Sequence, residues 1–210
     1  MPWLRKQMLL MGACLLTLAG QANADSLSDA KRALDAGDFA TAAKLYMPLA
    51  QQGNADAQFH LGELYDEGEG VPENDVEALQ WYRMAADQGH EAAQTVLGAM
   101  YSVGQGVTQD FKEAVRWDRL AAEQGSATAQ FNLGWLYKVG DGVPKDYVLA
   151  HMWFNIATAN VNEKQKASFI KSRDQIASLM TATQITEAQE RARKCTANRF
   201  KGCWLALLHG

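Results

Sequence analysis

The feature that most constrains this sequence is an internal repeat of 36 residues that runs without gaps. The recurring sets are Ala57, Ala93 and Ala129; Gln58, Gln94 and Gln130; Leu61, Leu97 and Leu133; Gly62, Gly98 and Gly134; Tyr65, Tyr101 and Tyr137; Gly68, Gly104 and Gly140; and Trp81, Trp117 and Trp153. Chance does not align so many positions at one spacing. A repeat of this length predicts supersecondary units that bury their apolar faces against their neighbours.

Each unit is predicted to form two helices joined by a glycine-rich loop. In the first helix, Ala57, Leu61 and Tyr65 are four residues apart and form one apolar stripe. Gly62 beside that stripe is expected to let a neighbouring helix approach closely. Gly68 is expected to end the helix in a left-handed conformation.

The second helix of each unit is predicted to begin at Asn74, Asp110 or Asp146, because these side chains are good N-caps. Glu77 and Glu113 follow three residues after two of them, a spacing that resembles a capping box. Neither helix of a unit can bury its apolar stripe alone. The predicted fold is therefore all-α, a right-handed superhelical solenoid of antiparallel helix hairpins.

Four segments are expected along the chain. Residues 1–24 have the pattern of a signal peptide, 25–53 of an N-terminal capping hairpin, 54–160 of three repeat units, and 161–210 of a C-terminal helical cap and tail.

The leader segment predicts export from the cytoplasm. Arg5 and Lys6 precede an uncharged apolar run over 8–19, and Ala22-Asn23-Ala24 matches a signal-peptidase site. The run is shorter than the roughly 20 residues of a membrane span. We expect cleavage after Ala24, a periplasmic or secreted protein, and no stable membrane insertion. The alternatives are an uncleaved anchor and a buried first helix.

Charge disfavours two classes of partner. Without the two basic residues of the leader, the chain has 18 basic and 24 acidic residues, a net charge of −6. Nucleic acids and anionic membrane surfaces require basic patches. Neither is an expected partner.

Cleavage would also remove Cys14 and leave Cys195 and Cys203. An even pair of cysteines in an exported chain favours a disulfide. Two free thiols are the alternative.

The repeated residues resemble the Sel-1-like repeat family, a relative of the tetratricopeptide repeats. Residues 55–90 carry its pattern almost completely: A-x-x-x-L-G-x-x-Y-x-x-G-x-G-V, then D, then A-x-x-W-Y-x-x-A-A-x-x-G. The departures are Asn74 for Asp, Thr108 for Pro and Asp118 for Tyr. The resemblance implies adaptor work, which exported bacterial members perform in envelope regulation, host interaction or stress signalling. Some secreted members link the two helices of each repeat by cysteines eight apart; Cys195 and Cys203 have that spacing but lie outside the repeats.

The sequence contains no recognisable catalytic or metal-binding pattern. The four histidines occupy unrelated positions, without H-x-x-x-H or a Cys/His cluster, and His151 fits a packed helix position. No serine lies in a G-x-S-x-G context. Asp66, Glu67 and Glu69 fit a solvated surface better than a cation site. The sequence therefore predicts no enzyme activity, no metal and no cofactor, and it does not indicate an oligomeric state.

A binding face is predicted from positions that vary between units, opposite the apolar stripe and spaced as one helix face. The candidate partner-binding residues are His60, Glu63, Val96, Ala99, Val103, Asn132, Trp135 and Val139. This face is acidic in the first unit and apolar in the others. Such patches mark interaction sites, and tryptophan is enriched in binding hot spots. The alternative is that the superhelix buries these residues between its units.

The predicted function is a non-catalytic adaptor or scaffold of the bacterial cell envelope that holds a protein segment on the concave face of the solenoid. A wall- or polysaccharide-associated spacer is the first alternative, and an envelope hydrolase is the second.

Overall fold

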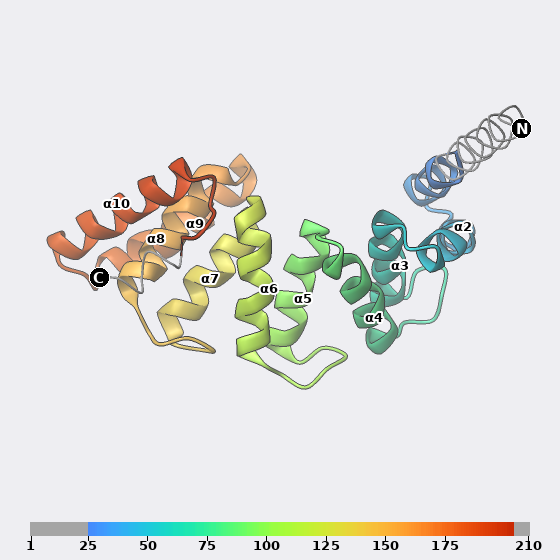
Figure 1. Ribbon diagram of the computed structural model, residues 1–210, viewed down its shortest axis with the longest axis horizontal. Helices are drawn as coiled ribbons and strands as arrows, with labels where there is room; N and C mark the ends of the chain where they lie inside the picture. The colour runs from blue at the N-terminus through green and yellow to red at the C-terminus, as the bar shows by residue number, and fades with distance from the viewer. Residues whose placement is uncertain (1–24, 204–210) are drawn as a thin grey trace, which may run out of the picture. The chain divides into compact units, whose positions relative to one another are not determined.

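The computed structural model describes residues 25–203, and Figure 1 shows the helices within them. Residues 25–35 are helical, and the later helices are α2 (Phe39–Gln51), α3 (Ala55–Glu67), α4 (Asp75–Asp87), α5 (Glu91–Val103), α6 (Phe111–Gln124), α7 (Ala127–Val139), α8 (Tyr147–Asn160), α9 (Glu163–Ala177) and α10 (Ala182–Ala197). No strand occurs in this range, which confirms the predicted all-α class. The predicted signal peptide lies outside the described residues.

None of the helices within residues 25–203 combines the length and apolar character that a membrane span requires.

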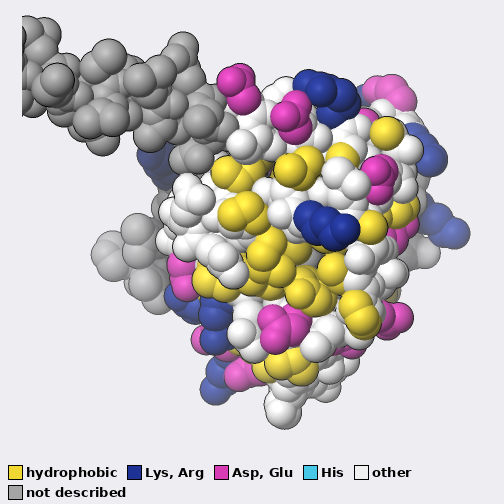
Figure 2. All heavy atoms as spheres, turned by 90° about the vertical axis from the view of Figure 1, so that its right-hand side faces the viewer, with side chains coloured by type: hydrophobic (Ala, Val, Ile, Leu, Met, Phe, Trp, Pro, Cys, Tyr) yellow, Lys and Arg dark blue, Asp and Glu magenta, His cyan; other side chains and the backbone are white. Residues whose placement is uncertain are grey.

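The chain divides into two compact units, which we describe separately: unit 1 up to Met84 and unit 2 from Ala85 onward. In unit 1, helix α2 packs on α3 around a core that includes Tyr46 and Leu61. Figure 2 views the molecule from the end that carries the first helices, where apolar side chains gather between acidic and basic ones.

In unit 2, helices α5 to α8 pack successively, and α9 and α10 both pack on α8. Trp153 and Phe154 of α8 are fully buried. Ile176 of α9 and Ala188 of α10 join the same core. Helices α9 and α10 thus cover α8, the last repeat helix.

The predicted helix starts are confirmed by their hydrogen bonds. The Asn74 Oδ1 atom accepts from the backbone N–H of Val76 at 3.1 Å. Asp110 accepts in the same way from Lys112 at 2.8 Å, and Asp146 from Leu149 at 2.9 Å. These bonds satisfy backbone donors that the first helical turn leaves free.

The predicted capping boxes are wrong. A capping box needs the backbone N–H of the N-cap residue as a donor to the glutamate. Here that N–H of Asn74 donates to the Tyr65 carbonyl at 2.8 Å, and that of Asp110 to the Tyr101 carbonyl at 2.9 Å. Because the loop already uses these donors, Glu113 pairs instead with Arg116 at 3.2 Å.

Close helix packing explains the recurring glycine inside the first helix of each repeat. A Cβ atom added to Gly62 would lie 2.8 Å from the ring of Tyr82, and one added to Gly134 would lie 2.6 Å from the ring of Phe154. Real Cβ contacts are longer, so only glycine lets the two helices pack at this distance.

The recurring glutamine joins successive helix pairs, a role that the sequence pattern alone did not reveal. Its buried side-chain amide donates to a carbonyl near the end of the preceding helix: Gln58 to Ala50 at 3.0 Å, Gln94 to Ala86 at 3.1 Å and Gln130 to Ala122 at 3.2 Å. Each bond links the first helix of a repeat to the last turn of the preceding helix, at a carbonyl that also accepts a backbone N–H group.

Candidate partner-binding site

Six of the predicted binding residues belong to one surface of unit 2, which we call the α5–α7 face. Its residues are Val96, Ala99 and Val103 of α5 and Asn132, Trp135 and Val139 of α7. Val103 is 69% exposed, Trp135 44% and Val139 48%. Ala99 is also exposed, whereas Val96 and Asn132 are half-buried. The three largest exposed apolar side chains of the face are therefore not buried between repeats.

Helices α5 and α7 are neighbours in unit 2. The hydroxyl oxygens of Thr95 on α5 and Ser126 at the start of α7 lie 3.0 Å apart. Asp118 of α6 lies between the two helices, since its carboxylate would be 2.6 Å from a Cβ atom on Gly98 and bonds to Asn132. The face is thus formed by two adjacent helices with a third behind them.

Trp135 has a charged neighbour on its own helix. The ammonium nitrogen of Lys138 lies 4.1 Å from the centroid of the Trp135 ring. A cation at this distance is attracted by the electron-rich face of an indole. The contact favours one orientation of the exposed ring. Less side-chain entropy is therefore lost when a partner binds and fixes the ring.

Asp118 is the most unusual side chain behind the face. It is fully buried; Oδ1 accepts a hydrogen bond from Asn132 Nδ2 at 3.1 Å, while Oδ2 has no partner among the described residues. Burial raises the pKa of this carboxyl well above its ordinary value, and the bond from Asn132 opposes that shift only in part. The sequence marks Asp118 as a departure from the repeat pattern but does not reveal this consequence.

The two candidates in unit 1 bind each other. His60 Nδ1 lies 2.8 Å from Glu63 Oε2, and the His60 ring also packs against Tyr46 with centroids 5.2 Å apart. The neighbouring Asp56 pairs with Lys31 at 3.2 Å. The acidic part of the predicted face is therefore partly neutralised within unit 1.

Neither a metal site nor a catalytic constellation stands out. Within residues 25–203, no group of three or more His, Cys, Asp or Glu side chains is placed to hold a metal ion. His151 is buried in α8, as predicted for a packed residue, and burial lowers its pKa. Within residues 25–203, Asp118 bonds to the side-chain amide of Asn132, which is neither a nucleophile nor a base.

The disulfide predicted from the sequence is present. Cys195 and Cys203 are bonded, and both are buried. Disulfides persist in oxidising compartments, so the bond indicates such a location.

Comparison with protein families matches the Sel1 repeat to residues 55–90, 91–126 and 127–161. The chain belongs to the Sel1 repeat family. Sel1 repeats typically mediate protein–protein interaction and are typically non-catalytic.

Two solved Sel1-type structures are similar to this chain. The first is a Sel1 repeat protein from Oxalobacter formigenes, with 30% identity and a TM-score of 0.62 over 80% of this chain and 75% of that one. The second is c5321, a protective antigen of uropathogenic Escherichia coli with an SLR fold. It shares 31% identity and a TM-score of 0.57 over 80% of this chain and 43% of its own. A comparison with curated proteins finds no match.

Proposed function

We propose that this Sel1 repeat protein is a non-catalytic adaptor of the bacterial cell envelope, and that its α5–α7 face binds a segment of a partner protein. The observation that carries the proposal is the joint exposure of Val103, Trp135 and Val139 on two adjacent helices. A folded domain gains stability by covering such side chains. Surfaces that leave them exposed together are typical of interaction sites.

Trp135 is the proposed anchor of the interaction. Its ring is the largest side chain of the face and is 44% exposed, and Lys138 favours one orientation of it. Large, preorientated aromatic side chains dominate the binding free energy of many interfaces. Ala99 adds a small exposed side chain on the neighbouring helix, which leaves room for the backbone of a bound segment.

His60 and Glu63 are proposed to form a separate acidic contact site in unit 1. A basic partner segment would complement this charge, and its association would weaken as salt rises. Because Glu63 is bound to His60, we expect this contribution to act on partner choice and association rate more than on affinity.

The cellular location is part of the same proposal. A signal peptide cleaved after Ala24 would deliver the chain to the periplasm or beyond it, where the Cys195–Cys203 bond can persist.

A polysaccharide-associated spacer is the second candidate, and the exposed ring of Trp135 is the observation that favours it. Aromatic rings can stack on sugar rings as well as on protein side chains. The neighbouring Val103 and Val139 favour the protein partner, because a glycan surface would be matched better by polar groups.

The test compares Trp135→Ala with Leu179→Ala, a matched control that removes another exposed apolar side chain outside the face. Each tagged variant is co-purified from envelope extracts, and the bound proteins and glycans are quantified. We expect Trp135→Ala to lose a discrete protein that the wild type and Leu179→Ala retain. Equal recovery of that protein by the wild type and both variants would contradict the adaptor proposal. Loss of a glycan in place of a protein would contradict it too.

A further inference from the structure

The α5–α7 face has an acidic group beneath it that contacts both of its helices. Asp118 of α6 is fully buried. Its Oδ1 atom accepts a hydrogen bond from Asn132 of α7 at 3.1 Å and would lie 2.6 Å from a Cβ atom on Gly98 of α5. Asn132 is itself a residue of the face, one helical turn before Trp135. The protonation state of this one carboxyl therefore affects how α5 and α7 pack.

Only the protonated form of this carboxyl suits its position. The Oδ2 atom of Asp118 has no hydrogen-bond partner among the described residues. An ionised carboxylate in a protein interior needs several donors or a cation, and its burial without them is strongly unfavourable. The equivalent positions of the other repeats hold buried aromatic rings, so packing between repeats does not require a carboxyl here. The single donor Asn132 is too little to stabilise the charged form.

No nearby charge compensates for ionisation of Asp118. The titratable residues of α5 and α7, the helices that pack most closely on α6, are Glu91, Tyr101, Tyr137 and Lys138. Helix α6 itself adds Lys112, Glu113, Arg116, Arg119 and Glu123. Within the described chain, none of these groups is a cause of the raised pKa of Asp118, which comes from burial and is opposed only by the bond from Asn132. The ionised carboxylate would therefore have to reach water.

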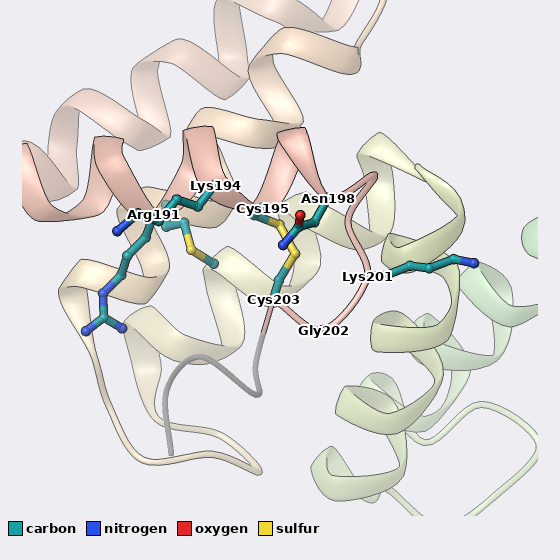
Figure 3. Close-up of a pocket in the computed structure, with 8 residues that line it drawn as sticks. Arg191, Lys194, Cys195, Asn198, Lys201, Gly202 and Cys203 are labelled. Carbon is teal, nitrogen blue, oxygen red and sulfur yellow. A yellow bond between two sulfur atoms is a disulfide. The ribbon is translucent and has the colours of Figure 1, made fainter. Parts of the chain in front are cut away.

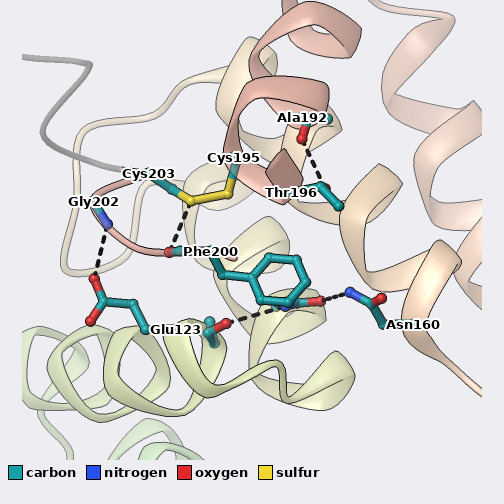
Figure 4. Close-up of a disulfide and its surroundings, with 10 residues drawn as sticks. Glu123, Asn160, Ala192, Cys195, Thr196, Phe200, Gly202 and Cys203 are labelled. Carbon is teal, nitrogen blue, oxygen red and sulfur yellow. Dashed lines mark hydrogen bonds between the residues drawn. A yellow bond between two sulfur atoms is a disulfide. The ribbon is translucent and has the colours of Figure 1, made fainter. Parts of the chain in front are cut away.

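Helix α6 is tied at its C-terminal end to the loop that follows α10. Gly202 N–H donates to Glu123 Oε1 at 3.3 Å (Figure 4). The Cys195–Cys203 disulfide connects the same loop to α10 (Figure 3). We therefore expect water to reach Asp118 by separation of α5 from α7, and not by displacement of α6.

We propose that Asp118 makes partner binding at the α5–α7 face dependent on pH. While Asp118 holds its proton, α5 and α7 pack against the carboxyl and present Val103 and Trp135 together. Loss of the proton draws water to the carboxylate, separates the two helices and disrupts the face. A partner that binds the packed form therefore binds with uptake of a proton. This control of binding rests on the proposed function, because the α5–α7 face must be the binding site.

Proton linkage determines the direction and size of the effect. A partner that requires the protonated form binds with constant affinity below the pKa of Asp118 in the free protein. Above that pKa the affinity falls about tenfold per pH unit, because the competent fraction of the protein falls by that factor. Asp118→Asn has no proton to release, so its affinity should not change with pH in this way.

Hydrogen exchange of the exported chain between about pH 5 and pH 9 tests the change in packing. Protection factors, corrected for the chemical exchange rate at each pH, are compared between α5, α7 and the reference helix α10. In the wild type, protection should fall with rising pH, and it should fall more in α5 and α7 than in α10. Asp118→Asn should remove this difference. Asp141→Asn, which removes a charge from the loop after α7, should behave as the wild type. Thermal unfolding checks that each variant is folded.

Co-purification from one envelope extract at about pH 5.5 and pH 8.5 tests the effect on binding. The bound protein to be quantified is the one that Trp135→Ala fails to recover. The wild type and Asp141→Asn should recover several times more of it at the lower pH. Asp118→Asn should recover equal amounts at both, which also controls for any effect of pH on the partner itself.

The two measurements separate failure of this proposal from failure of the proposed function. Wild-type protection that is constant with pH, or that falls equally in α5, α7 and α10, would overturn the pH control whether or not a partner is found. The same pH profile of recovery for the wild type and Asp118→Asn would overturn it and leave the proposed function intact. Greater wild-type recovery at the higher pH would contradict the assigned direction. If Trp135→Ala loses no protein, the proposed function fails and the control of binding fails with it, even where exchange shows that the packing depends on pH.

Discussion

Asp118 and Asn132 form a hydrogen bond of 3.1 Å at a place where the other repeats have an aromatic ring. The equivalents of Asp118 are Tyr46, Tyr82 and Phe154, all buried. Residue 132 corresponds to His60, whose ring packs on Tyr46. The same two positions therefore make an aromatic contact in unit 1 and a polar contact in unit 2. The polar version leaves one carboxylate oxygen buried without a partner among the described residues.

Stability should depend on pH through Asp118. The pKa of its carboxyl is raised in the folded state. The folded protein therefore keeps this carboxyl protonated at pH values above about 4, where the unfolded chain releases the proton. The stabilising effect of that proton is complete below the unfolded pKa and is lost as pH rises toward the folded pKa. Asp118→Asn should therefore gain stability relative to the wild type as pH rises, by roughly 1–3 kcal/mol at neutral pH.

Urea unfolding between pH 4 and pH 8 measures this difference. Asp141→Asn, in the loop between α7 and α8, is the matched control, because it removes the same charge from a loop that is not buried. A constant difference between Asp118→Asn and the wild type across that range would contradict the assigned direction of the pKa shift.

Gly134→Ala should destabilise the fold despite its better helix propensity. Propensity alone would stabilise α7 by up to about 1 kcal/mol. The new Cβ atom would lie 2.6 Å from the Phe154 ring, and crowding of a packed core costs about 1–3 kcal/mol. Crowding should win. Thermal unfolding beside Thr128→Ala, an exposed site on the same helix, measures the effect; a higher melting temperature for Gly134→Ala would refute the packing argument.

Gln130→Ala should cost about 1–3 kcal/mol, because it removes two hydrogen bonds made by a fully buried side chain. The Gln130 amide donates to Ala122 and accepts from Asn160 Nδ2 at 3.0 Å. Gln189→Ala removes an exposed glutamine of α10 and should be nearly neutral. Similar denaturation midpoints for the two variants would mean that the buried bonds contribute no net stability.

Loss of the disulfide should lower stability by about 2–3 kcal/mol, since it frees a short loop in the unfolded chain. The change should be largest near α10, where Cys195 and Cys203 lie. Hydrogen exchange of the Cys195→Ala, Cys203→Ala variant measures both the loss of stability and the helices in which it occurs. Faster exchange in α5 than in α10 would be inconsistent with a local structural role.

The fold could be predicted because each weak sequence signal recurs in several repeats, and the repeats support one another. Gly62, Gly68 and Asn74 each have a weak signal alone, but the same residue type or role recurs at a fixed spacing. The predicted capping boxes are wrong because the backbone N–H groups of the two N-cap residues donate to the carbonyls of Tyr65 and Tyr101, and residue spacing does not encode these hydrogen bonds.

The candidate site was predicted only in part. Exposure of Val103, Trp135 and Val139 follows from helix periodicity, because they lie opposite the repeated apolar stripe. The pairing of Asp118 with Asn132 depends on a contact between residues of two different helices. A single sequence does not specify such a contact, although it marks Asp118 as a departure from the repeat pattern.

Photocrosslinking from position 135 in living cells tests the central claim most directly. A photoreactive residue replaces Trp135 in one strain and Thr186, an exposed position on α10, in another. The account predicts a discrete protein crosslinked from position 135, absent from position 186 and lost when Val96→Asp is added. A folded, exported protein that gives no crosslink from position 135, or the same crosslinks from both positions, would contradict it.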